Sequence, residues 1–122
     1  MPVRSLNSSV LVWPNRKEVD AAARDWARRE ARRHPELVRV GYFGSYARGD
    51  WGVGSDLDLL AIVRDREEPF ERRAMGYDLL KLPVPAELLV YTEAEWDRLI
   101  ASGSPFARRV QRETVWLHSP KQ

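Results

Sequence analysis

The most constraining feature of this 122-residue sequence is the run at residues 56–63, Asp-Leu-Asp-Leu-Leu-Ala-Ile-Val. Apolar residues occupy every position after Asp58, which indicates a strand that is covered on both faces. Asp56 and Asp58 lie two positions apart, so their side chains would point to the same face at the start of that strand. Two like charges at the start of a buried strand are costly without a cation. The run therefore predicts a layered sheet with a cation-binding edge.

Other segments predict helices and further strands around this run. The expected helices cover residues 15–34, 46–48, 69–80, 93–103 and 105–113, and the other expected strands cover residues 37–43, 88–91 and 114–117. Asn15 and Thr92 are the expected caps of two of the helices, and Pro35 ends the first helix. The alternation of helices and strands predicts an α/β (α+β) fold, with a small mixed sheet of three or four strands and helices packed on it. The length predicts a single domain over residues 1–122.

Composition excludes several classes of protein. The sequence contains no cysteine, which excludes disulfides and thiolate metal sites and is typical of an intracellular protein. No segment approaches the roughly 20 apolar residues that cross a bilayer, and the N-terminus lacks the pattern of a signal peptide. We therefore expect a cytoplasmic protein without a membrane partner. Basic and acidic residues are interleaved at a net charge of +2, so direct binding of nucleic acid is not expected.

The residues between the first two expected strands carry the candidate chemistry. Gly44 ends a strand, where glycine permits a sharp turn and close approach of a ligand. Ser45 supplies a hydroxyl at the start of a short helix, a position that favours a phosphate. Asp56 and Asp58 supply the carboxylate oxygens that Mg²⁺ prefers. A third carboxylate usually helps to hold a pair of such ions, and Glu87, at the start of the neighbouring strand, is the candidate.

Several nearby residues allow two interpretations. Arg48 suits a phosphate, but it also suits an ion pair with Asp50. Trp51 is placed to stack on a base or to pack locally in its loop. Asp78 is a possible substitute ligand, although a solvated position in the helix at residues 69–80 is favoured. His34 lies outside any metal-ligand spacing, and we expect it at the surface.

The same residues give the sequence a family resemblance. It resembles the minimal nucleotidyltransferase family of the DNA polymerase beta superfamily, whose pattern is Gly-Ser, ten intervening residues and Asp-x-Asp. Gly44 and Ser45, the ten residues 46–55, and Asp56-Leu57-Asp58 match that pattern without a gap. The resemblance implies a polymerase-beta-like nucleotidyltransferase fold, triphosphate contacts from Gly44 and Ser45, and a two-ion Mg²⁺ site held by Asp56 and Asp58. The family's third carboxylate is typically Asp, so Glu87 departs from the pattern.

The resemblance also implies a function. Its members transfer a nucleoside monophosphate, and we expect AMP transfer from ATP to an acceptor hydroxyl, with Glu87 helping to activate that hydroxyl. A chain of 122 residues leaves no room for the helical acceptor domain of larger relatives. Minimal members act with a separate helical HEPN (higher eukaryotes and prokaryotes nucleotide-binding) protein, a toxin whose tyrosine the antitoxin adenylylates. The alternative is a catalytically weak or inactive antitoxin that only binds its partner. A homo- or hetero-oligomer is compatible with either reading.

Overall fold

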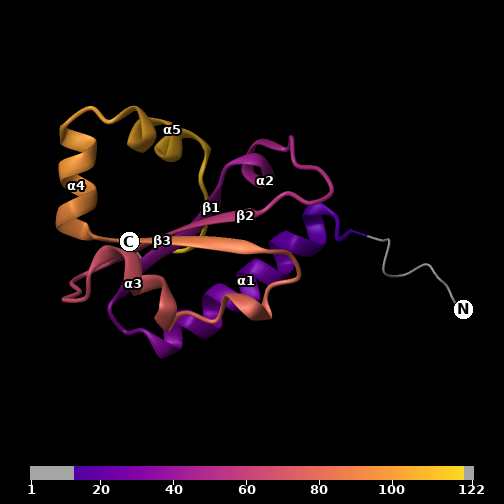
Figure 1. The fold of residues 1–122 in the computed structure, drawn as a ribbon, viewed down its shortest axis with the longest axis horizontal. Coiled ribbons are helices and arrows are strands. Elements are labelled where there is room, and N and C mark those ends of the chain that lie inside the picture. Colours follow the sequence, from indigo (N-terminus) through magenta and orange to yellow (C-terminus); the bar gives the residue numbers. More distant parts are fainter. Residues whose placement is uncertain (1–12, 120–122) are drawn as a thin grey trace, which may run out of the picture.

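The computed structural model, which describes residues 13–119, has a four-stranded sheet at its centre (Figure 1). The strands lie in the order β3 (Ala86–Thr92), β2 (Leu57–Val63), β1 (Leu37–Phe43) and β4 (Val115–His118). β2 runs parallel to β3, whereas β1 is antiparallel to both β2 and β4. This mixed sheet with its helices confirms the expected fold class. The strand expected at residues 114–117 is also confirmed, one residue later than predicted, and it lies at the edge of the sheet.

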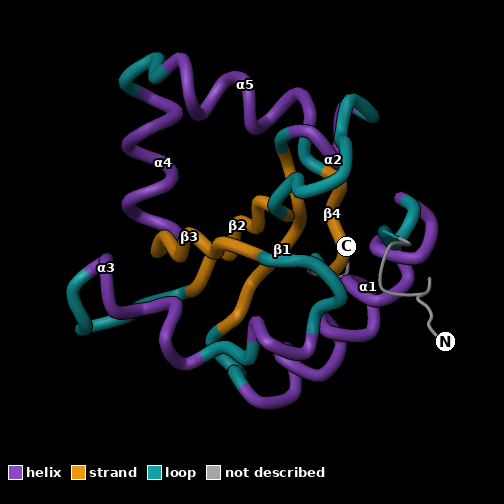
Figure 2. The backbone as a smooth tube through the Cα atoms, turned by 45° about the vertical axis from the view of Figure 1, so that its right-hand side comes forward, coloured by secondary structure: helices purple, strands orange, loops and turns teal. Residues whose placement is uncertain are grey.

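The helices lie on both faces of the sheet. α1 (Arg16–Arg33) lies against one face, and α4 (Glu93–Ala101) and α5 (Pro105–Glu113) lie against the other (Figures 1 and 2). A four-residue helix, α2 (Ser45–Arg48), follows β1 at one end of the sheet. No helix among residues 13–119 is long and apolar enough to cross a membrane.

Local capping sets the start of α1 and α4 as predicted. The Asn15 side chain accepts from the backbone N–H of Glu18, and the Glu18 side chain accepts from the N–H of Asn15, at 2.8 and 2.9 Å. Thr92 and Glu95 form the same reciprocal pair at the start of α4. Each pair satisfies two backbone donors that the first turn of a helix leaves free. These two helix starts follow from residues three positions apart.

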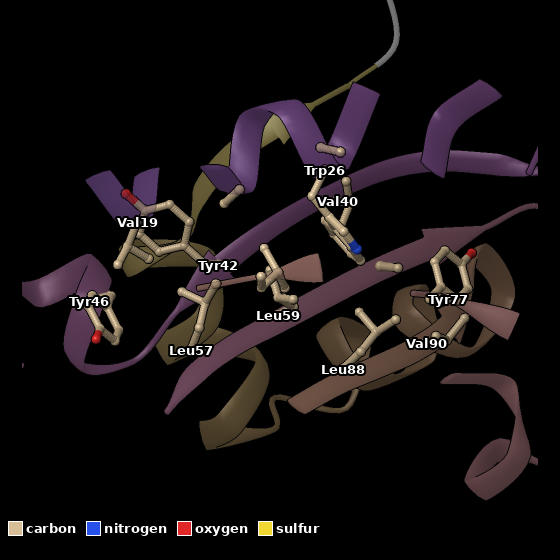
Figure 3. Packing of buried hydrophobic residues seen from close by; sticks show 14 of the residues in the cluster. Val19, Trp26, Val40, Tyr42, Tyr46, Leu57, Leu59, Tyr77, Leu88 and Val90 are labelled. Carbon is tan, nitrogen blue, oxygen red and sulfur yellow. The ribbon is translucent and has the colours of Figure 1, made fainter. Parts of the chain in front are cut away.

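The larger core cluster lies between α1 and the sheet (Figure 3). Trp26 of α1 is fully buried and packs with side chains from β1, β2 and β3. Every residue of β2 is buried except Asp58, which is half-buried. The strand is therefore covered on both faces, as its apolar run predicts, and its one polar residue lies at the candidate site.

The expected helix over residues 69–80 is wrong. The chain forms only the short α3 (Phe70–Arg73) and two 3-10 turns, η2 (Ala74–Gly76) and η3 (Leu79–Lys81). Tyr77 adopts an extended backbone, with φ −110° and ψ 145°, and its ring stacks on His34 with centroids 4.1 Å apart. His34 is consequently largely buried, not at the surface. Packing of Tyr77 against the end of α1 breaks a helix that local propensity alone would allow.

Candidate functional site

The directions of the strands bring the predicted site residues together at one end of the sheet. β1 ends where β2 and β3 begin, because β1 is antiparallel to β2 and β2 is parallel to β3. In this register Phe43 lies opposite Asp58, and Asp58 lies beside Glu87. Gly44 follows Phe43 directly, and exposed Asp56 precedes the start of β2. Residues that are 43 positions apart in the sequence thus meet at the end of the sheet where α2 lies.

Gly44 is required by both its backbone and its neighbour. Its φ of 80° and ψ of −152° belong to a region that only glycine readily adopts. A Cβ atom at this position would overlap with Oδ2 of Asp58. The turn after β1 therefore packs its backbone directly against the carboxylate that opens β2. This contact couples the Gly-Ser part of the motif to the Asp-x-Asp part.

Ser45 and Arg48 lie at the two ends of α2. Ser45 is its first residue, as the sequence predicts, and Gly44 is its N-cap. Arg48 forms an ion pair with Asp50, Nε to Oδ2 3.0 Å, and a second with Glu113, Nη1 to Oε2 3.2 Å. Of the two interpretations of Arg48, the structure contains the ion pair with Asp50. The phosphate contact stays a prediction.

Asp58 is the carboxylate of the site whose pKa is shifted by its surroundings. Burial raises the pKa of the Asp58 carboxyl above its usual value, and the negative charges of Glu87 and Asp56 raise it further. Arg48 and Arg109 oppose this shift without cancelling it. The carboxylates thus repel one another, and a bound cation would relieve that repulsion.

The carboxylates do not by themselves form a closed metal cage. Within residues 13–119, no group of three or more His, Cys, Asp or Glu side chains converges tightly enough to hold a metal ion. Mg²⁺ rarely needs such a cage, since one or two carboxylates suffice when water and substrate phosphates complete its shell. Asp58 and Asp56 offer oxygen donors of the required kind at the start of β2. Their assignment as metal ligands, and that of Glu87, stays a prediction.

Aromatic packing holds the glycine-rich loop that joins α2 to β2. Trp51 stacks on Tyr46 of α2, with ring centroids 5.4 Å apart and planes 9° apart. The Tyr46 hydroxyl accepts a hydrogen bond from Trp13 Nε1 at 2.9 Å, and its carbonyl accepts one from Arg16 Nε at 2.8 Å. Trp51 therefore packs locally, the second of the two interpretations given by the sequence. The stack ties the loop to α2 and to the start of α1.

Asp78 lies away from this edge. Its backbone N–H donates to Glu30 Oε1 at 3.3 Å, and its carbonyl accepts from Trp26 Nε1 at 2.9 Å, so the residue is held against α1. It is half-buried between the turns η2 and η3, not solvated on a helix. Asp78 is also absent from the charges that shift Asp58. It does not replace Glu87 as the third carboxylate.

Sequence reasoning missed the contribution of α5 to the site. Glu113 Oε2 accepts the backbone N–H of Gly44 at 2.6 Å and also pairs with Arg48. The positive charge of Arg109, one helical turn earlier, lowers the pKa of Asp58 and so opposes the effect of burial. The signal was present but indirect: Val115 pairs with Tyr42 in antiparallel register, so the residues before β4 must lie beside those after β1. Only the pairing of β4 with β1 makes this inference possible.

A family model and several solved structures match this chain. The model for the nucleotidyltransferase domain matches residues 24–117. A provisionally assigned nucleotidyltransferase from Sulfolobus solfataricus has a similar structure, with 24% identity, a TM-score of 0.60, and coverage of 83% of this chain and 80% of that one. A toxin–antitoxin structure with AMP-PNP matches at 18% identity and a TM-score of 0.51, covering 81% of this chain and 75% of that one. At these identities the two structures show a shared fold. No curated protein matches the sequence significantly.

Proposed function

The chain belongs to the nucleotidyltransferase domain family, and we propose that it transfers AMP from ATP to an acceptor hydroxyl in the cytoplasm. The observation that carries this proposal is the contact between Gly44 and Asp58, which joins the two halves of the motif at one edge of the sheet. A triphosphate held at the turn would therefore lie beside the carboxylates. Gly44, Ser45 and Arg48 bind the triphosphate in this scheme.

The carboxylates bind Mg²⁺ in the proposed site. Asp56 and Asp58 would hold the ions of a two-ion site, and Glu87 would be the third carboxylate that binds them. The pKa of Asp58, raised by burial and by the charges of Glu87 and Asp56, supports this assignment, because a cation at this position would relieve the repulsion. Bound Mg²⁺ would neutralise negative charge on the phosphates and on the attacking and leaving oxygens.

The proposed reaction is an in-line displacement at the α-phosphorus of ATP. The acceptor oxygen forms a bond to that phosphorus, the bond to the bridging oxygen breaks, and pyrophosphate leaves. Glu87 lies at the open end of β3 and is exposed, so its carboxylate is available to take the proton of the acceptor hydroxyl. The rest of the rate acceleration comes from positioning and from charge stabilisation.

We assign the acceptor to a tyrosine on a helical HEPN toxin, with this chain as the antitoxin. Two observations support the assignment. The motif at residues 44–58 has the minimal form that the resemblance connects with such pairs. A toxin–antitoxin structure containing AMP-PNP, an ATP analogue, shares the fold.

A second function is favoured by Glu87 itself. Glutamate stands where the family typically has aspartate, and no three acidic side chains in the described part of the chain converge on one metal position. A chain that retained nucleotide binding without transfer would act as an antitoxin by covering its partner. This alternative requires a stable complex and no covalent product.

One labelling experiment separates the two functions. The protein is incubated with Mg²⁺, ATP labelled on the α-phosphate and the candidate partner, alongside Asp56→Asn, Glu87→Ala and the matched control Asp78→Asn. Transfer predicts label on the partner with the wild type and Asp78→Asn, at least a hundredfold less with Asp56→Asn, and a large loss with Glu87→Ala. A tight complex without label in any sample would contradict transfer and leave the covering role.

A further inference from the structure

A carboxylate of the protein already occupies the donors that the proposed function gives to the triphosphate. Glu113, at the end of α5, accepts the Gly44 N–H at 2.6 Å. The same carboxylate accepts from Arg48 Nη1, at 3.2 Å to Oε2 and 3.4 Å to Oε1. One backbone donor and one guanidinium thus converge on a single anionic group. Among residues 13–119, Glu113 is the only residue whose side chain is hydrogen-bonded to both of them.

The hydrogen bond between Gly44 and Glu113 is partly shielded from solvent, which strengthens it. The Glu113 side chain is only 12% exposed, and Gly44 is buried. A charge-assisted bond to a backbone N–H is shorter and stronger than a neutral one, and more so in a medium of low dielectric constant. A buried N–H also requires an acceptor, and beyond the β1–β2 ladder Gly44 obtains it from Glu113. The Gly44 N–H is therefore oriented towards an anionic acceptor.

Arg48 is an exposed residue that pairs with two carboxylates. Its Nε donates to Asp50 and its Nη1 to Glu113, so two of its donor positions are taken. A phosphate that binds Arg48 must share or replace one of these partners. Asp50 is exposed in the loop and offers no contact to Gly44, whereas Glu113 blocks both donors at once. Replacement of Glu113 is the exchange that frees the larger part of the site.

We propose that Glu113 competes with the triphosphate for Gly44 and Arg48, so that nucleotide binding displaces the end of α5 from the turn. This inference rests on the proposed function and adds a means of regulation to it. α5 continues directly into β4 through Thr114, so displacement of Glu113 is transmitted to the edge strand of the sheet. In the closed position, Glu113 contacts Gly44 and Arg48. A contact that holds α5 or β4 in this position should lower the affinity for nucleotide.

The expected change in affinity depends on how strongly Glu113 favours its position at the turn. If Glu113 favours the closed position about tenfold, equivalent to about 1.4 kcal/mol, the apparent Kd for nucleotide is about tenfold higher than the intrinsic one. Glu113→Gln keeps an acceptor for the Gly44 N–H and removes the charge that pairs with Arg48, so it should bind nucleotide about fivefold more tightly. Glu113→Ala removes both contacts and should bind about tenfold more tightly.

The test is a calorimetric titration of the full chain with AMP-PNP in the presence of Mg²⁺, for the wild type and both Glu113 variants. Glu67→Gln, a change of the same charge in an exposed loop, is the matched control, and thermal unfolding verifies that each variant is folded. Tighter binding by the Glu113 variants alone supports competition. Equal or weaker binding by them, with a wild type that binds, overturns competition and makes Glu113 a support for Arg48. Absence of binding in every sample overturns the proposed function, and the competition with it.

Discussion

Substitution of Gly44 by alanine tests how the turn and the carboxylate are coupled. The φ and ψ of Gly44 lie in a region where a residue with a Cβ atom costs about 1–3 kcal/mol. The new methyl group also overlaps with Oδ2 of Asp58, and such overpacking adds about 1–3 kcal/mol. We expect Gly44→Ala to lower the free energy of unfolding by about 3–4 kcal/mol in urea denaturation. Gly49→Ala has a similarly positive φ of 87° with no atom near the added methyl group, and it should cost only about 1 kcal/mol.

A double-mutant cycle isolates the contact from the backbone strain. In an Asp58→Ala background the overlapping atoms are gone, so Gly44→Ala should cost only its backbone strain. The two substitutions should therefore couple by about 1–2 kcal/mol, as residues in direct contact do. Additive effects of the two substitutions would refute the packing of Gly44 against Asp58, and so would equal costs for Gly44→Ala and Gly49→Ala.

Three further predictions concern charge and packing at the site and elsewhere in the fold. The hydrogen bond from Arg73 lowers the pKa of Glu95 to about 2, so the pair stabilises the fold fully above pH 4.5, and this stability is lost as the pH falls towards 2. Glu95→Gln should accordingly lower the free energy of unfolding by about 2 kcal/mol at pH 7 in urea denaturation, and it should reduce the loss of stability between pH 4.5 and 2. An unchanged loss of stability in that pH range would contradict the pairing. The raised pKa of Asp58 means that its ionisation destabilises the fold as the pH rises through that pKa. Asp58→Asn should therefore raise the Tm at pH 7 in metal-free buffer by a few degrees. A lower Tm would contradict the repulsion between the carboxylates. Trp51→Ala removes the stack on Tyr46 and should cost about 2 kcal/mol and speed amide hydrogen exchange in residues 49–55; slow exchange there would show that the stack does not hold the loop.

The parts of the fold that the sequence predicts are those decided by nearby residues. The capping box at Asn15 depends on Glu18, three positions away, and it fixed the start of α1. The unbroken apolar run after Asp58 predicts a strand covered on both faces, and β2 is such a strand. The motif at Gly44 was also recognisable, because the spacing to Asp58 lies within one short stretch of sequence.

The parts that could not be predicted depend on contacts across the sheet. The helix expected at residues 69–80 breaks because Tyr77 stacks on His34, a partner 43 positions earlier in the chain. The role of Glu113 depends on β4 pairing with β1, which no local pattern reveals. Both misses arise where long-range packing decides the structure over local propensity.

We propose that the carboxylates at the start of β2 bind Mg²⁺ together with a nucleoside triphosphate at the Gly44 turn. The most direct test is calorimetric titration of AMP-PNP, with and without Mg²⁺, into the wild type, Asp58→Asn and the distant control Asp78→Asn. We expect Mg²⁺-dependent binding by the wild type and by Asp78→Asn, and at least tenfold weaker binding by Asp58→Asn. Equal affinity for AMP-PNP in all three proteins, or an affinity that does not depend on Mg²⁺, would contradict the proposed site.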